Sequence, residues 1–194
     1  MARSENARAA LVKLIRTIRL DPSDTFVFER AAEPGEWAVS GAFAFWNTDA
    51  AKLEGKVRSA FRGAFLGVDS LGWSTLVQIV EASPADCAAV VERLAQQLVA
   101  HFGAPDIAAA HVAAEEEVAF AASLCNHPAD TLIAVHRSFE DGEVREAFRT
   151  LHPRGDKKPM RAFSFLEVEG EQAPADEVDL VAMAHASRLR IRNE

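Results

Sequence analysis

The sequence predicts a single α+β domain, in which an antiparallel sheet packs against a long pair of helices. Three observations lead to this prediction. Turn sequences divide the N-terminal part into strand-like segments, two segments of helical periodicity follow one another directly, and an Asp-Gly pair separates two alternating segments nearer the C-terminal end. Strands grouped apart from helices are typical of α+β proteins, and we expect a sheet of about six or seven strands.

The N-terminal part predicts three strands joined by short turns. Apolar residues alternate with polar or small residues within 11–20, 25–30 and 36–46. Asp21-Pro22 and Pro34-Gly35 lie between these segments, and proline is favoured at the first central position of a tight turn. The segments therefore predict an antiparallel meander. The small residues that alternate along 36–46 predict a helix packed closely on that strand.

The middle of the chain predicts a short helix, a central strand and a helical hairpin. Residues 56–66 show helical spacing, and residues 73–80 are apolar on both faces, as in a strand covered on both sides. Ser83-Pro84 is typical of a helix start and predicts a helix over 84–102. A second helix over 105–125 follows so closely that the two must run antiparallel. The next strand should then lie antiparallel to the strand at 73–80.

Asp141-Gly142 is the strongest hairpin signal in the sequence. Both residues tolerate the positive φ of a type I′ turn, which predicts strands at 131–140 and 143–151. A two-residue loop places Arg137 opposite Glu146 as a cross-strand ion pair. A slip by one residue would break this pair and two apolar pairs on the same face. The two apolar pairs are Val135–Phe148 and Phe139–Val144, and His136 lies opposite Ala147.

The expected domain organisation is a flexible N-terminus at 1–10, a single domain at 11–168 and an acidic tail or docked helix at 169–194. Residues 160–168 can add a last strand to the sheet, after a polar connection. No internal repeat divides the chain.

The net charge of -8 limits the classes of partner. Residues 71–135 contain many acidic residues but a single Lys or Arg, which is Arg93. A field of this sign repels phosphate backbones, so we expect no nucleic-acid partner. The sequence has no signal peptide and no apolar run of membrane-spanning length, and two cysteines are typical of a reduced compartment. We therefore expect a cytoplasmic protein that does not bind membranes.

Two segments, LIRTIRLDPSDTFVF at 14–28 and EEVAFAASLC at 116–125, resemble a family of bacterial proteins of about this length and of unknown function. The resemblance covers most of the chain before Arg154. It implies a bacterial cytosolic protein, and it supplies no activity and no site residues.

Familiar catalytic and cofactor motifs are absent from the sequence. There is no phosphate-binding glycine loop, dinucleotide fingerprint, nucleophile elbow, HExxH or paired CxxC. We therefore predict no cofactor and favour a protein without enzymatic activity.

The second predicted helix and its surroundings contain the residues of a possible metal site. His111 and Glu115 lie one helical turn apart, and Cys125 and His127 follow the helix end. His136, in the following strand, could join them. The alternative interpretation is that His111 is a hydrogen-bonded boundary residue and that Cys125 is a small buried hydrophobic residue.

Glu115, Glu116 and Glu117 form a run of carboxylates in the same helix. Consecutive helical residues point in different directions, so the run is not a matched acid–base pair. Glu115 and Glu116 should face water. Glu117 lies nearer the apolar stripe and could accept hydrogen bonds there.

The face of the Asp141-Gly142 hairpin opposite to Arg137 is a candidate anion site. The predicted register places His136 diagonal to Arg145 and Arg149, with small Ala147 directly opposite. Guanidinium groups bind carboxylates and phosphates through paired hydrogen bonds. The alternative interpretation is an exposed face whose arginine stems cover apolar surface.

The function we expect from the sequence is binding of a protein partner or a small anion by a non-enzymatic protein that could form a homodimer. The alternative is a small enzyme or metal-binding protein that uses the His, Glu and Cys residues between 111 and 136.

Overall fold

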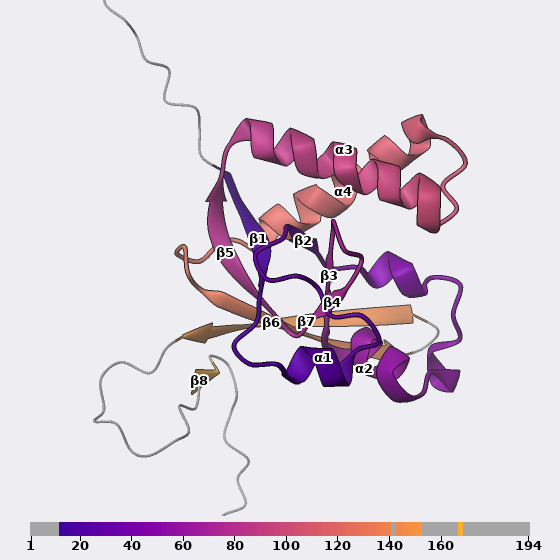
Figure 1. Cartoon of the computed structure of the whole chain (residues 1–194), viewed down its shortest axis with the longest axis vertical. Helices are drawn as coiled ribbons and strands as arrows, with labels where there is room; N and C mark the ends of the chain where they lie inside the picture. The colour runs from indigo at the N-terminus through magenta and orange to yellow at the C-terminus, as the bar shows by residue number, and fades with distance from the viewer. Residues whose placement is uncertain (1–11, 141–142, 153–166, 169–194) are drawn as a thin grey trace, which may run out of the picture.

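Two antiparallel sheets organise the fold, with helices on both sides of them (Figure 1). The computed structural model describes residues 12–140, 143–152 and 167–168. The larger sheet has the order β1-β5-β6-β7-β8, and the smaller has the order β2-β3-β4. The strands of the larger sheet are β1 (Val12–Ile18), β5 (Leu76–Ala82), β6 (Leu132–Glu140), β7 (Glu143–His152) and β8 (Glu167–Val168). Those of the smaller sheet are β2 (Ala38–Val39), β3 (Phe65–Gly67) and β4 (Trp73–Ser74).

The helices form two groups on opposite sides of the strands. In Figure 1, α3 and α4 lie together at the top of the view, and α1 and α2 lie at the bottom. In the described part of the chain, no helix is long and apolar enough to cross a membrane. The α-helices are α1 (Ser23–Val27), α2 (Gly55–Gly63), α3 (Pro84–His101) and α4 (Ile107–Ser123), and the short 3₁₀ helices are η1 (Ala42–Phe45) and η2 (Ala50–Lys52).

The main core lies between the α3–α4 pair and the sheets. Helix α4 contacts β1 and β2 through a buried face of small residues, because alanine allows a helix to approach a strand closely. Ile15 of β1, Val77 and Ile79 of β5 and Ile133 of β6 belong to the same buried core. The buried residues of α4 are Ala110, Ala114, Val118 and Ala121.

The predicted helical hairpin is confirmed, together with its start. The side chain of Ser83 accepts from the Asp86 amide at 3.1 Å, and the Asp86 carboxylate accepts from the Ser83 amide at 2.9 Å. These reciprocal bonds satisfy amides that lack partners within the first turn, and Pro84 has no amide to satisfy. Strand β5 is an interior strand between β1 and β6, and β6 pairs with it antiparallel, as the short helix connection predicts. The predicted strand at 73–80 is divided, because Trp73 and Ser74 form β4 of the smaller sheet.

The predicted N-terminal meander is wrong. Strand β1 pairs with β5, so its hydrogen bonds go to a segment about sixty residues further along the chain. Residues 25–30, predicted as the returning strand, begin within α1 instead. Helix α1 is held by Asp24, whose buried carboxylate accepts from the Thr75 hydroxyl at 2.6 Å and from the Thr75 amide at 3.2 Å. Phe26 is 71% exposed as a result.

The third predicted strand, 36–46, is only two residues long. It ends at Val39, and the chain leaves the extended region at Gly41, whose φ is +77°. A Cβ at Gly41 would lie 2.6 Å from the Cβ of Leu66, so only glycine fits against β3 here. The chain then forms η1 instead of continuing the strand. The short β2 pairs with β3.

The predicted helix at 56–66 is confirmed as α2, but it ends at Gly63. The following residues pair with β2 and β4 as strand β3. A second core surrounds α2, and Phe45 contacts both Phe61 and Trp73 there. Its buried residues are Phe28, Phe45, Leu53, Ala60, Phe61 and Ala64.

The predicted hairpin is confirmed with its register. Strands β6 and β7 pair Arg137 with Glu146 and His136 with Ala147. The apolar pairs Val135–Phe148 and Phe139–Val144 also form as expected. The last strand predicted at 160–168 is described only at β8, which pairs with Leu151 and His152. The expectations for 1–10 and 169–194 lie outside the described residues.

Candidate functional site

The exposed face of the β6–β7 hairpin carries three basic residues side by side. The register places Arg145 opposite Ser138 and Arg149 opposite Ala134, so both arginines lie diagonal to His136. All three basic residues are exposed. Diagonal neighbours on paired strands are about 7–8 Å apart, within reach of long side chains. Ala147, which pairs with His136, lies between the arginines on β7, and its side chain extends only to Cβ.

One carboxylate already contacts this basic face. The Nε atom of Arg145 lies 3.3 Å from Oε2 of Glu140, and Oε1 of Glu140 accepts from the Ser138 hydroxyl at 2.9 Å. The contact shows that the Arg145 guanidinium can reach a carboxylate on its own face. Both partners are more than half exposed, so the ion pair itself contributes little stability.

The opposite face of the hairpin is fixed by a buried arginine. Arg137 is 1% exposed, and its Nε donates to Oε1 of Glu146 at 2.6 Å. Its Nη1 donates to the carbonyls of Phe61 at 3.1 Å and Ala64 at 2.7 Å, at the C-terminal end of α2. Its Nη2 donates to the carbonyl and, at 3.1 Å, to the hydroxyl of Ser40. A buried guanidinium with partners for each nitrogen links β6 to β7, α2 and the end of β2.

Ser40 completes this network, which we call the Arg137 network and define as Arg137, Glu146, Ser40 and the two α2 carbonyls. The Ser40 hydroxyl donates to Oε1 of Glu146 at 2.5 Å, so the same carboxylate oxygen takes bonds from two sides. The last carbonyls of a helix lack partners within it, and the cation satisfies two of them near the negative end of the α2 dipole. Beneath the basic face, the hairpin is therefore tied to the end of α2 and to the segment after β2.

Glu117 approaches the Arg137 network from α4. It is half-buried, while Glu115 and Glu116 are exposed, as the helical positions predicted. Burial, followed by the negative charge of Glu146, raises the pKa of Glu117 to about 7, although Arg137 acts in the opposite direction. Its Oε2 atom is buried and has no hydrogen-bond partner among the described residues. Glu117 can therefore change its protonation state near neutral pH.

The structure does not bring the predicted metal ligands together. His111 forms a 2.9 Å contact between its Nε2 and Oε2 of Glu92 on α3. Glu115 is exposed, and the carbonyl of His127 accepts from Nζ of Lys13 at 2.7 Å. Among residues 12–140, 143–152 and 167–168, no group of three or more His, Cys, Asp or Glu side chains could hold a metal ion.

Cys125 is part of the main core. Its Sγ donates to the Ala121 carbonyl at 3.4 Å, and burial raises the pKa of the thiol to about 11. The thiolate, not the thiol, binds metals. The placement agrees with the interpretation of Cys125 as a small buried hydrophobic residue.

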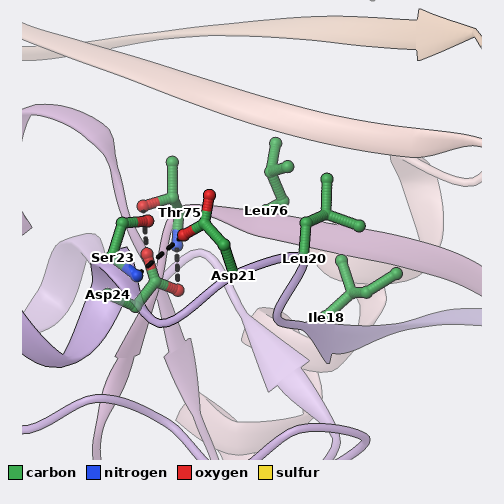
Figure 2. Close-up of a pocket in the computed structure, with 7 residues that line it drawn as sticks. All are labelled: Ile18, Leu20, Asp21, Ser23, Asp24, Thr75 and Leu76. Carbon is green, nitrogen blue, oxygen red and sulfur yellow. Dashed lines mark hydrogen bonds between the residues drawn. The ribbon is translucent and has the colours of Figure 1, made fainter. Parts of the chain in front are cut away.

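A small hollow lies at the end of β1, on the same sheet face as the basic residues, and sequence reasoning missed it. Ile18, Leu20 and Leu76 line one wall, and four polar residues line the other (Figure 2). The volume is about 100 Å³. The hollow depends on the β1–β5 pairing and on α1, and local sequence signals indicated neither. The four polar residues are Asp21, Ser23, Asp24 and Thr75.

The fold and this site define a two-sheet α+β protein with a basic hairpin face on a buried ionic support. The chain belongs to a family of unknown function (DUF6505), whose family model matches residues 12–166. The match confirms the resemblance to a family of unknown function that we noted in two segments of the sequence. No curated protein and no solved structure shows significant similarity to the chain.

Proposed function

We propose that this protein binds small anions, without enzymatic activity, on the exposed hairpin face formed by His136, Arg145 and Arg149. The observation that carries the proposal is the strand register, which places an imidazole between two guanidinium groups on one exposed face. Guanidinium groups bind carboxylates and phosphates through two parallel hydrogen bonds, which gives direction as well as affinity.

The Arg137 network beneath the basic face favours anion binding with little rearrangement of the protein. Arg137 is held by partners from three other elements, so β6 and β7 are tied to the rest of the fold. A ligand that meets a preformed site loses less affinity to the ordering of side chains and backbone. Ala147, between the arginines on β7, adds only a Cβ atom to this face.

The charge of the whole chain favours a small anion over a polyanion. The net charge is -8, so an extended nucleic acid would meet a repulsive field beyond the hairpin. A ligand no larger than the basic face experiences mainly its local positive charge, because exposed charges are screened over roughly 8–10 Å at physiological ionic strength.

A thermal-shift experiment with inorganic phosphate and malonate tests the proposal. At ten times the dissociation constant, a bound anion should stabilise the fold by about 1.4 kcal/mol and raise the melting temperature by about 3–6 °C. Arg149→Ala should abolish this rise. Arg58→Ala, which removes an exposed arginine on α2, is the matched control and should keep it.

The proposal is wrong if neither anion shifts the melting temperature of the parent protein, or if Arg58→Ala and Arg149→Ala reduce the shift equally. A protein partner and homodimer formation stay predictions. The alternative of a small enzyme or metal-binding protein also stays a prediction, and no contact among the described residues favours it over anion binding.

A further inference from the structure

One row of residues crosses the larger sheet from the hollow to the basic face. Ile18 pairs with Leu76, Leu76 pairs with Ala134, and Ala134 pairs with Arg149. Directly paired residues lie on the same face of a sheet. The apolar wall of the hollow and Arg149 are therefore two ends of one surface, which we call the cross-sheet row.

The dimensions of the cross-sheet row suit a short molecule. Neighbouring strands are about 4.8 Å apart, so the backbone of β7 at Arg149 lies roughly 10 Å from that of β5 at Leu76. Ala134 occupies the strand between them with a side chain that extends only to Cβ. A ligand that lies across β6 at this row therefore meets a side chain no longer than Cβ from that strand.

The hollow has room for a short aliphatic group. Its volume of about 100 Å³ is smaller than the roughly 150 Å³ of a cavity that holds benzene. Ile18 and Leu76 are half-buried, while Leu20 is 61% exposed at its rim. In Figure 2 these three side chains lie on one side of the hollow, apart from the polar side chains. An aliphatic group placed there would remove apolar surface of Leu20 from water.

The polar wall of the hollow disfavours a second anionic group. The two carboxylate oxygens of Asp24 already accept hydrogen bonds from Thr75. Oδ1 of Asp21 accepts from the Ser23 amide at 2.7 Å, and hydrogen bonds to Ser23 lower the pKa of Asp21. The Asp21 carboxylate is therefore negative at neutral pH and repels an anion at the end of the hollow.

We infer that the ligand is a short amphipathic monoanion, whose acidic group binds at Arg149 and His136 and whose aliphatic chain lies across Ala134 with its end in the hollow. The inference rests on the proposed anion site and names the class of ligand for it. A short-chain monocarboxylate has this chemistry. A long dicarboxylate does not, because its far carboxylate would approach Asp21.

Titration calorimetry with acetate, butanoate and hexanoate tests the inference, with adipate as the dicarboxylate of the same length as hexanoate. Affinity should rise along the monocarboxylate series. Full burial of a methylene contributes about 0.8 kcal/mol, so each added methylene should tighten binding by up to about fourfold. Adipate should bind more weakly than hexanoate.

Three variants locate the two ends of the ligand. Ser23→Leu should fill the hollow, and Leu20→Ser should remove its exposed apolar rim. Both variants should make the affinity for monocarboxylates less dependent on chain length. Both should leave the affinity for phosphate unchanged. Leu20, Asp21 and Ser23 are all exposed, and Ser23→Leu removes a side-chain hydrogen bond to Asp21 within the same turn, so both variants should stay folded. Arg149→Ala should weaken phosphate and hexanoate alike.

The outcomes separate this inference from the proposed function. Phosphate binding that depends on Arg149, with equal affinity for all three monocarboxylates, would overturn the amphipathic ligand and leave the anion site intact. A chain-length effect that persists in Ser23→Leu and Leu20→Ser would overturn the placement in the hollow. Absence of phosphate binding to the parent protein would overturn the proposed function and the inference with it.

Discussion

Arg137 is the residue on which the support of the basic face depends. It is fully buried, and its partners come from β7, α2 and the segment after β2. Removing one partner of a buried ion pair leaves the other charge without compensation, whereas replacing both with apolar residues can be nearly neutral. The buried charge therefore constrains the geometry of the hairpin more than it adds to the stability of the fold.

Arg137→Met should lower the free energy of unfolding by about 3–5 kcal/mol, because Glu146 then keeps a buried charge and the α2 carbonyls lose a donor. The double variant Arg137→Met/Glu146→Leu should recover part of this loss. Urea denaturation at neutral pH measures both. Arg62→Met, at an exposed position of α2, is the control and should change the stability little. An Arg137→Met protein as stable as that control would contradict the role given to Arg137.

Glu117 should make the stability of the fold depend on pH. Its folded-state pKa is about 7, raised above the ordinary value of 4.5. The folded state then binds the proton more tightly than the unfolded state, so this contribution is fully present below about 4.5 and is lost as pH rises to about 7. The full loss corresponds to at most about 3 kcal/mol.

Glu117→Gln removes this titration. Relative to the parent, the variant should gain stability as pH rises through this window, and the difference should become constant above it. Chemical denaturation at a series of pH values measures the difference. Glu116→Gln, one residue away and exposed, is the matched control. Equal pH profiles for the parent and Glu117→Gln would show that Glu117 titrates normally.

At the scale of elements, the predictions that held depended on neighbours in the chain. The α3 start follows from Ser83, Pro84 and Asp86, which interact within one helical turn. The β6–β7 register follows from a two-residue turn and the pairs that it sets. The sequence therefore predicted the candidate anion residues in their observed arrangement, before any long-range contact was known.

The predictions that failed concerned elements fixed by distant residues. Residues 25–30 alternate like a strand, but Asp24 bonds to Thr75 and the chain begins a helix there. Strand β1 pairs with β5, so it cannot form the predicted meander with the next segment of the chain. No local signal in the sequence favours one partner strand for β1 over another. The hollow and the burial of Arg137 both depend on such contacts, so they could not be predicted.

Gly41 lies two residues after β2, and two effects at this position can be separated by experiment. Gly41→Ala and Gly35→Ala both place a side chain at positive φ, which costs about 1–2 kcal/mol. Only Gly41→Ala also brings a Cβ within 2.6 Å of Leu66, whereas nothing lies within 4 Å of a Cβ at Gly35. Gly41→Ala should therefore lower the melting temperature clearly more than Gly35→Ala. An equal fall in melting temperature for both variants would show that β3 moves away from the added Cβ without cost.

In the whole molecule, the two faces of the larger sheet differ in packing and in charge. One face packs against α4 and contains the main core, with the Arg137 network at its hairpin end. The other carries the basic residues and, across the cross-sheet row, the hollow at β1. Because the whole chain has a net charge of -8, we expect it to repel an extended polyanion from this second face.

We propose above all that small anions bind at the exposed face of the β6–β7 hairpin. A nuclear magnetic resonance titration with phosphate, which follows the backbone amides, tests it most directly. We expect saturable shifts concentrated at His136, Arg145 and Arg149 and their neighbours, with α3 unchanged and with the shifts lost in Arg149→Ala. Shifts that are absent, that do not saturate, or that concentrate on α3 would contradict it.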